Sequence, residues 1–147
     1  MPIKTIRGII ANNAIDVVPL HTNNGAVGYV IKSLRVIGAD PINNEDEGVI
    51  KVYTVPQTTP TSTIDFSDQT LIAVGVWTSR ATSRSYPLNE NIYFDNTTFN
   101  QDIYITCIES ATGNALNYYI ELEQVKLDLN ENTVATLKDI RNITAPT

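Results

Sequence analysis

The C-terminal part of the chain contains the clearest alternation of apolar and polar positions. In residues 115–129, "ALNYYIELEQVKLDL", every second position is mainly apolar and the positions between are mainly polar. The apolar set is Tyr118, Ile120 and Leu122, and the other set is Asn117, Tyr119, Glu121 and Glu123. A period of two residues is typical of a strand with one buried face. The pattern therefore predicts a half-buried strand.

A second strand precedes it in residues 101–110, "QDIYITCIES", where Ile103, Ile105 and Cys107 share one face. The intervening "ATGNA", residues 111–115, contains a Gly-Asn pair of the kind that favours a tight turn. We therefore expect these two strands to form a hairpin.

The alternation shifts after Glu123. Val125 and Leu127 occupy the face that Tyr119 and Glu121 held before. Such a shift predicts a β-bulge or a switch of the strand between sheets.

Short apolar runs separated by turn residues recur in the rest of the chain. They are "IKTIRGIIA", "AIDVVPL", "AVGYVIKSLRVIG", "VIKVYTV", "LIAVGVWTS" and "NIYF". With the two strands above, this predicts an all-β fold, a two-sheet sandwich or jelly roll of about eight short strands.

Residues 130–147 have a different pattern. In "NENTVATLKDIRNI" an Asn can cap a helix, and Val134, Leu137 and Ile140 recur at every third position. We expect a short C-terminal helix and tail over 130–147, lying on or extending from a β-sandwich domain over 1–129.

The charge balance argues against two classes of partner. The 147 residues include 10 Lys and Arg against 16 Asp and Glu, a net charge of −6. Nucleic-acid binding requires a basic stripe, and an anionic membrane surface attracts a basic amphipathic segment. The sequence contains neither, so we expect no nucleic-acid and no membrane partner.

Candidate catalytic residues are few. His21 is the only histidine and Cys107 the only cysteine, and Cys107 continues an apolar strand face, as free core cysteines often do. The sequence contains no Walker loop, no G-x-G-x-x-G, no C-x-x-C and no G-x-S-x-G. We expect a protein that is not an enzyme, with no catalytic residue, no cofactor and no metal.

Two groups of carboxylates are candidate sites. Glu121 and Glu123 lie on one strand face, but glycosidase carboxylates flank the scissile bond from opposite sides, so a solvated face is the better interpretation. The turn "DPINNEDEG" carries enough oxygen ligands for calcium, yet its spacing is not that of the EF-hand loop. Its acidic residues are Asp40, Glu45, Asp46 and Glu47, and we interpret them as a charged, solvated turn.

Two loops are better suited to surface contact. "VPQTTPTSTIDF" holds Pro56 and Pro60 among polar residues, which predicts a stiff, extended segment that can lie along a neighbour. "TSRATSRSYP" gathers Arg80, Arg84 and Tyr86, residue types that are favoured at contacts. We take these five residues as the candidate partner-binding set.

A small acidic β-rich chain of this kind, above all "NIYFDNTTFNQDIYITCIESATGNALNYYIELEQVKLDLNENTVATLKDIRNI" over its last third, resembles structural proteins of tailed-bacteriophage virions. Within that class it is most similar to head decoration, or cement, proteins. The resemblance implies synthesis in the host cytoplasm and a place on the capsid surface. It also implies binding to the major capsid protein or another virion protein, as a homo-oligomer with a trimer favoured.

Two alternatives remain open. A head–tail connector or tail component would share the same composition. A carbohydrate-binding sandwich module would stack sugar rings on exposed aromatic side chains, for which Trp77, Tyr104 and Tyr119 are the candidates, although Trp77 lies in an apolar run that favours burial.

Overall fold

The computed structural model describes residues 2–21, 26–79, 88–127 and 136. Nine strands form within these ranges. They are β1 (Ile3–Ile10), β2 (Ala14–Val18), β3 (Val27–Gly38), β4 (Asp46–Tyr53), β5 (Leu71–Ser79), β6 (Leu88–Tyr93), β7 (Thr98–Phe99), β8 (Ile103–Glu109) and β9 (Leu116–Lys126).

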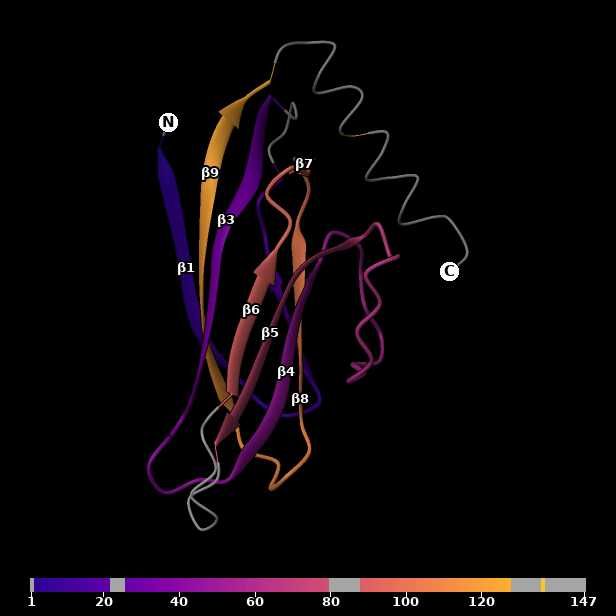
Figure 1. Ribbon diagram of the computed structural model, residues 1–147. Helices are drawn as coiled ribbons and strands as arrows, with labels where there is room; N and C mark the ends of the chain where they lie inside the picture. The colour runs from indigo at the N-terminus through magenta and orange to yellow at the C-terminus, as the bar shows by residue number, and fades with distance from the viewer. Residues whose placement is uncertain (1, 22–25, 80–87, 128–135, 137–147) are drawn as a thin grey trace.

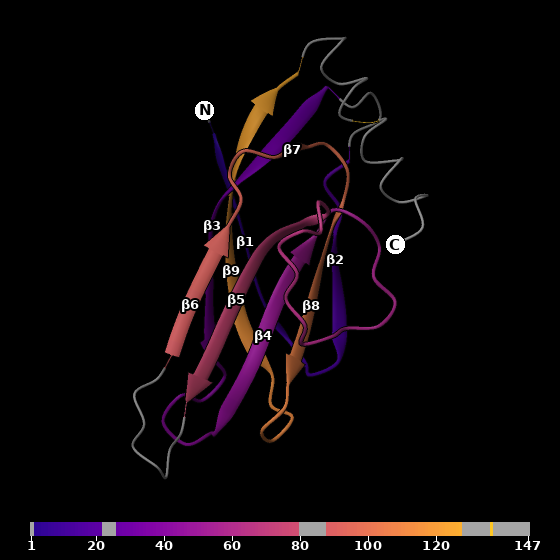
Figure 2. The same ribbon diagram turned by 45° about the vertical axis from the view of Figure 1, so that its right-hand side comes forward.

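The strands form two antiparallel sheets that stand as two layers (Figures 1 and 2). The four-stranded sheet has the order β1-β9-β3-β7, and the five-stranded sheet has the order β2-β8-β4-β5-β6. The predicted all-β, two-sheet fold is confirmed. The described part of the chain has nine strands rather than about eight, and β3 and β9 are long.

The core lies between the two sheets and is built from alternate residues of their strands. In β9 the inward set is Leu116, Tyr118, Ile120 and Leu122, each at most 7% exposed. The inward residues of β3, β4, β5 and β8 pack against them, among them Ile31, Val36, Ile50, Ile72 and Ile105. The predicted apolar faces of residues 101–110 and 115–129 are therefore confirmed.

The predicted hairpin between those two strands is wrong. β8 lies in the five-stranded sheet between β2 and β4, whereas β9 lies in the four-stranded sheet between β1 and β3. Residues 110–115 cross from one layer to the other, and Gly113 adopts a left-handed φ of 76° there. A Gly-Asn turn suits both a hairpin within one sheet and a crossing between two sheets. The strand patterns do not decide either, because each strand has one buried face in both arrangements.

Glu109, at the end of β8, organises this crossing. Its carboxylate is 1% exposed and accepts four backbone N–H groups, from Glu47, Ala111, Thr112 and Asn114. The neighbouring turn from β1 to β2 also changes sheets, and there Asn12 accepts the backbone N–H of Glu109 at 2.9 Å. We call this the crossover end of the sandwich.

The predicted irregularity near Glu123 lies in a neighbouring strand. β9 keeps a regular register with β3 from Glu123 through Lys126. The register shift is in β3, between Ile31 and Ser33, so Lys32 is the extra residue. The predicted irregularity is therefore at the right place along the sheet, beside Glu121 and Leu122, but it lies in β3 and not in β9.

The predicted helix and tail over 130–147 lie outside the described residues, apart from Thr136. The hydroxyl oxygen of Thr136 accepts a hydrogen bond of 2.7 Å from the side chain of Asn100, which is fully buried. Across the described ranges, the chain has no helix whose length and apolarity would let it cross a membrane.

Candidate functional site

Lys51 is buried in the centre of the outer face of the five-stranded sheet. Its side chain stands on β4, is 2% exposed, and points away from the core between the sheets. The ammonium group donates to the hydroxyl of Thr61 at 3.0 Å and to the backbone carbonyl oxygen of Thr63 at 2.7 Å. One buried cation therefore fixes the long segment between β4 and β5 against the sheet.

The surroundings of Lys51 lower the pKa of its ammonium group below the ordinary value. Burial lowers the pKa of Lys51, while the negative charge of Asp68 acts to raise it. The ring of Tyr53 lies 5.5 Å from the ammonium group and contributes a cation–π contact. The two hydrogen bonds and this contact offset the desolvation of the charge.

Two further bonding patterns stiffen the segment over 54–70. The carboxylate of Asp65 accepts the backbone N–H and the hydroxyl of Ser67, at 2.9 and 2.6 Å. Asp68 does the same for Thr70, at 2.9 and 2.6 Å. Such turns satisfy the backbone without a strand ladder.

The prolines of this segment lie at its surface. Pro56 is exposed and Pro60 is half-buried. The segment lies along the chain's own sheet, on the side facing away from β1, β9 and β3 (Figure 1). Its interactions with Lys51 thus occupy part of the surface that sequence reasoning assigned to a partner, whereas contact between Pro56 or Pro60 and a partner stays a prediction.

A cleft of about 150 Å³ opens where this segment meets the turn after β6. The ring of Phe66 is 54% exposed and lies edge-on to Phe94, with centroids 5.5 Å apart. The other residues that line the cleft are Asp68, Gln69, Leu71, Asn96 and Thr97. The cleft combines two aromatic rings with amide and hydroxyl groups.

Beside the segment, apolar side chains remain partly uncovered on the same outer face. Val49, Val76 and Ile108 are paired across β4, β5 and β8 and are all half-buried. Ile92 on β6 adds a side chain that is 41% exposed. We call these four residues the apolar stripe.

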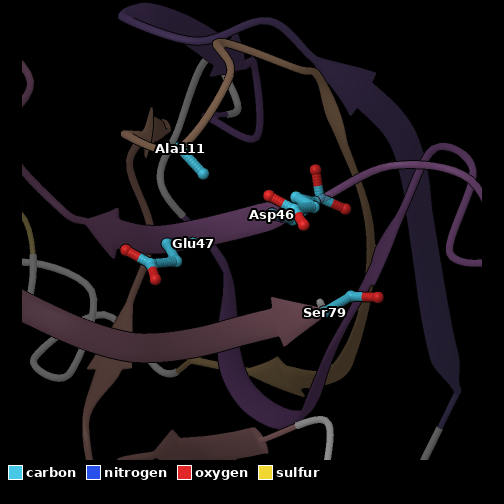
Figure 3. A pocket seen from close by; sticks show the side chains of 5 residues that line it. Asp46, Glu47, Ser79 and Ala111 are labelled. Atoms are coloured by element: carbon cyan, nitrogen blue, oxygen red, sulfur yellow. The ribbon is translucent and has the colours of Figure 1, made fainter. Parts of the chain in front are cut away.

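A second pocket, of about 240 Å³, lies at the crossover end (Figure 3). Asp46 borders it but is fully buried, and its carboxylate accepts the indole N–H of Trp77 and the amide of Asn114, each at 3.2 Å. Asp46 therefore begins β4 and belongs to the interior, which corrects its assignment to a solvated turn. Asp40 does lie in the turn, bonded to Asn43.

Within the described ranges, no three His, Cys, Asp or Glu side chains are placed to hold a metal ion.

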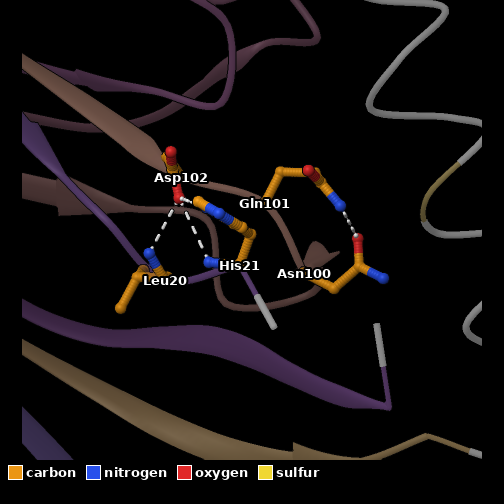
Figure 4. Close-up of polar contacts among 5 residues, drawn as sticks. All are labelled: Leu20, His21, Asn100, Gln101 and Asp102. Atoms are coloured by element: carbon orange, nitrogen blue, oxygen red, sulfur yellow. Dashed lines mark hydrogen bonds and ion pairs between the residues drawn. The ribbon is translucent and has the colours of Figure 1, made fainter. Parts of the chain in front are cut away.

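His21 and Cys107 are not brought together. His21 follows β2 and bonds through Nδ1 to Asp102 at 2.6 Å (Figure 4). Cys107 pairs with Ala14 at the opposite end of β2, about 13 Å or more of strand away. Burial raises the pKa of the Cys107 thiol to about 12, with the charges of Glu109 and Asp16 adding to the effect.

The other candidate residues are dispersed. Trp77 packs against the core and Tyr104 against the cluster beneath the 54–70 segment, while Tyr119 lies on the outer face of the other sheet. The three aromatic side chains do not form one platform. Glu121 accepts the Tyr119 hydroxyl at 2.8 Å and Glu123 lies 3.4 Å from the Lys32 ammonium group, so these carboxylates have local partners.

Arg80, Arg84 and Tyr86 lie outside the described residues, and their role stays a prediction.

Sequence reasoning missed Lys51 and Glu109. A signal for Lys51 was present: it is the one charged residue inside "VIKVYTV", where apolar residues occupy both strand faces. Glu109 carried no comparable signal, because a carboxylate at a strand end is ordinary in sequence.

Comparisons with protein-family models and with curated protein sequences give no match. The fold defines the chain as an antiparallel β-sandwich protein, and the candidate surface consists of the apolar stripe and the anchored segment 54–70.

Proposed function

We propose that this chain is a structural virion protein that binds the outer surface of a phage capsid lattice and stabilises it. The observation that carries the proposal is the apolar stripe beside a segment fixed by Lys51. In this stripe Ile92 is exposed, and Val49, Val76 and Ile108 are half-buried. A partly apolar surface next to a rigid rim is suited to contact with another protein.

Pre-organisation supports this function. A segment already held by side-chain bonds loses little conformational entropy when a partner covers it. Many copies on a repeating lattice also gain avidity, so each contact can be modest. The partner would be the major capsid protein or another virion protein, bound by a homo-oligomer for which the resemblance favours a trimer.

Occupancy of virus particles tests the proposal. Particles of the virus that carries the gene are stripped of this protein and then titrated with purified wild type or variants. The double variant Val49→Thr and Val76→Thr keeps β-branched residues on the strands but removes apolar surface, so occupancy near half-saturation should fall. Ile42→Thr changes an isoleucine that is 82% exposed in the turn before β4 and serves as the matched control. Equal occupancy for all three proteins would contradict the role of the stripe.

The arginine loop is tested in the same assay. If Arg80 and Arg84 bind carboxylates of the lattice, changing both to Ala should lower occupancy without shifting the melting temperature of the isolated protein. The position of bound protein on the particle separates the decoration function from a head–tail connector or tail component.

Carbohydrate binding is the second candidate function, and the cleft at Phe66 and Phe94 supports it. Accessible aromatic rings beside the amides of Gln69 and Asn96 offer stacking and hydrogen bonds, the two interactions that sugars use. Retention on a glycan array that is lost in Phe66→Ala would favour this function. No retention, together with particle binding, would favour the lattice function.

A further inference from the structure

The outer face of the four-stranded sheet has an ordered pattern of side chains. Four rungs cross it, each with one residue from β1, β9 and β3 in that order. They are Ile9–Asn117–Ile37, Arg7–Tyr119–Arg35, Thr5–Glu121–Ser33 and Ile3–Glu123–Val30. We call this surface the ladder face. No segment of the chain that the structure describes covers it in Figure 1.

The outer rungs of the ladder face expose apolar surface. Ile3 is 53% exposed, Ile9 is 57% exposed and Ile37 is 50% exposed. Ile3 and Ile9 stand on β1, whose register with β9 is unbroken, and Ile37 stands on the part of β3 that follows its bulge. The rungs at both ends of the face are therefore apolar at their margins.

The inner rungs have opposite charges. Arg7 and Arg35, both exposed, flank Tyr119 in one rung. The next rung carries Glu121, whose carboxylate accepts the Tyr119 hydroxyl. Beside it, Lys32 of the β3 bulge lies 3.4 Å from Glu123, and the charges of this pair offset each other. The rung with two arginines, the positive row, and the rung with one carboxylate, the negative row, thus lie side by side at the middle of the face.

From this arrangement we infer that the ladder face binds a second copy of the chain around a two-fold axis. The axis runs across the strands, between the rung of Tyr119 and the rung of Glu121. Such an axis places the positive row of each copy over the negative row of the other. It also places the rung of Ile9 and Ile37 over the rung of Ile3 and Val30, so apolar margins meet. A two-fold interface must be self-complementary, and this face satisfies that condition.

The inference does not depend on the lattice binding of the proposed function, and it differs from that proposal in oligomeric state, because this face predicts a dimer where the resemblance favours a trimer. The ladder face and the apolar stripe lie on opposite outer sides of the sandwich, so a dimer leaves the stripe free to bind a lattice. Failure of particle binding in the stripe variants would not alter dimerisation, and a monomeric protein could still occupy particles.

Charge reversal gives a test that only this geometry passes. Variant one carries Arg7→Glu and Arg35→Glu, and variant two carries Glu121→Arg. In each variant alone, like charges face one another across the axis, and self-association should weaken about tenfold or more. In an equimolar mixture the two introduced glutamates of variant one face the introduced arginine of variant two. The native Glu121 of variant one faces the rung of variant two that keeps Arg7 and Arg35. The mixture should therefore form heterodimers.

Sedimentation equilibrium of the full chain measures these states, and melting temperatures show that both variants remain folded. Lys126→Glu reverses an exposed charge beyond the rungs and should dimerise like the wild type. A wild type that is monomeric or trimeric would overturn the inference. So would a mixture that stays monomeric, or variants that self-associate as well as the wild type does.

Discussion

The ammonium group of Lys51 donates a hydrogen bond of 2.7 Å to the backbone carbonyl oxygen of Thr63, twelve residues along the chain. Lys51→Met removes this bond and the bond to Thr61, while a Met side chain still fills the apolar site. We expect hydrogen exchange to accelerate at backbone amides over 56–66. The free energy of unfolding should change little, because the lost bonds are offset by the relief of a buried charge.

Lys126→Met provides the control, because it makes the same change at an exposed position at the end of β9. It should leave exchange over 56–66 unaltered. Unchanged exchange in Lys51→Met as well would show that Asp65 and Asp68 suffice to hold the segment.

Glu109 is predicted to be the residue on which the crossing between sheets depends most. Glu109→Gln replaces one acceptor oxygen with an amide that cannot accept the backbone N–H groups of that side. A buried group left unsatisfied costs about 1–3 kcal/mol, so the free energy of unfolding should fall by about 2 kcal/mol. Urea denaturation measures it, with Glu90→Gln, at an exposed site on β6, as the control. Equal midpoints for the two variants would refute this role for Glu109.

Much of the fold follows from period-two patterning. The alternation in residues 115–129 identifies the buried face of β9. Alternate residues of a strand point to opposite faces of the sheet, so only one orientation of β9 buries Ile120 and Leu122 in the core. The pairing of strands does not follow in the same way. β8 and β9 are adjacent in sequence but belong to different sheets. β8 pairs with β4 and β9 pairs with β1, and these partners lie far away in the chain.

The candidate site was less predictable for a similar reason. Pro56 and Pro60 indicated a stiff segment, but what holds the segment is Lys51 on another element. The polar sequence neighbours of Asp46 indicated a solvated turn. Its burial depends on Trp77 and Asn114, which only the tertiary structure brings to it.

Cys107 should be chemically silent in the native protein. Its side chain is fully buried and its thiol pKa is raised to about 12, so almost none of it is thiolate at neutral pH. We expect a disulfide-exchange reagent such as DTNB to react with it only after unfolding in guanidinium chloride. Stoichiometric reaction of the folded protein within seconds would contradict its place in the core. Cys107→Ser should lower the free energy of unfolding by about 1–3 kcal/mol, because it buries a hydroxyl without an assigned partner.

Asp102 gives the chain an acid-sensitive contact near the start of β8. Burial acts to raise the pKa of Asp102, but hydrogen bonds from the His21 ring and from the backbone N–H groups of Leu20 and His21 outweigh it, so the pKa is lowered below 3.8. In the window between the lowered pKa and 3.8 the unfolded chain binds more protons than the native one, and stability therefore rises with pH. The contribution of Asp102 to the free energy of unfolding is complete above its ordinary pKa. It is lost as the pH falls through the lowered pKa that Asp102 has in the folded protein.

Replacing the carboxylate tests this contact. Asp102→Asn should be less stable than the wild type at pH 7, and the difference should shrink as the pH falls below about 4. His21→Ala keeps both backbone bonds and should retain part of that pH dependence. Urea denaturation at a series of pH values measures all three proteins, and parallel stability curves for wild type and Asp102→Asn would exclude this contact as a source of acid sensitivity.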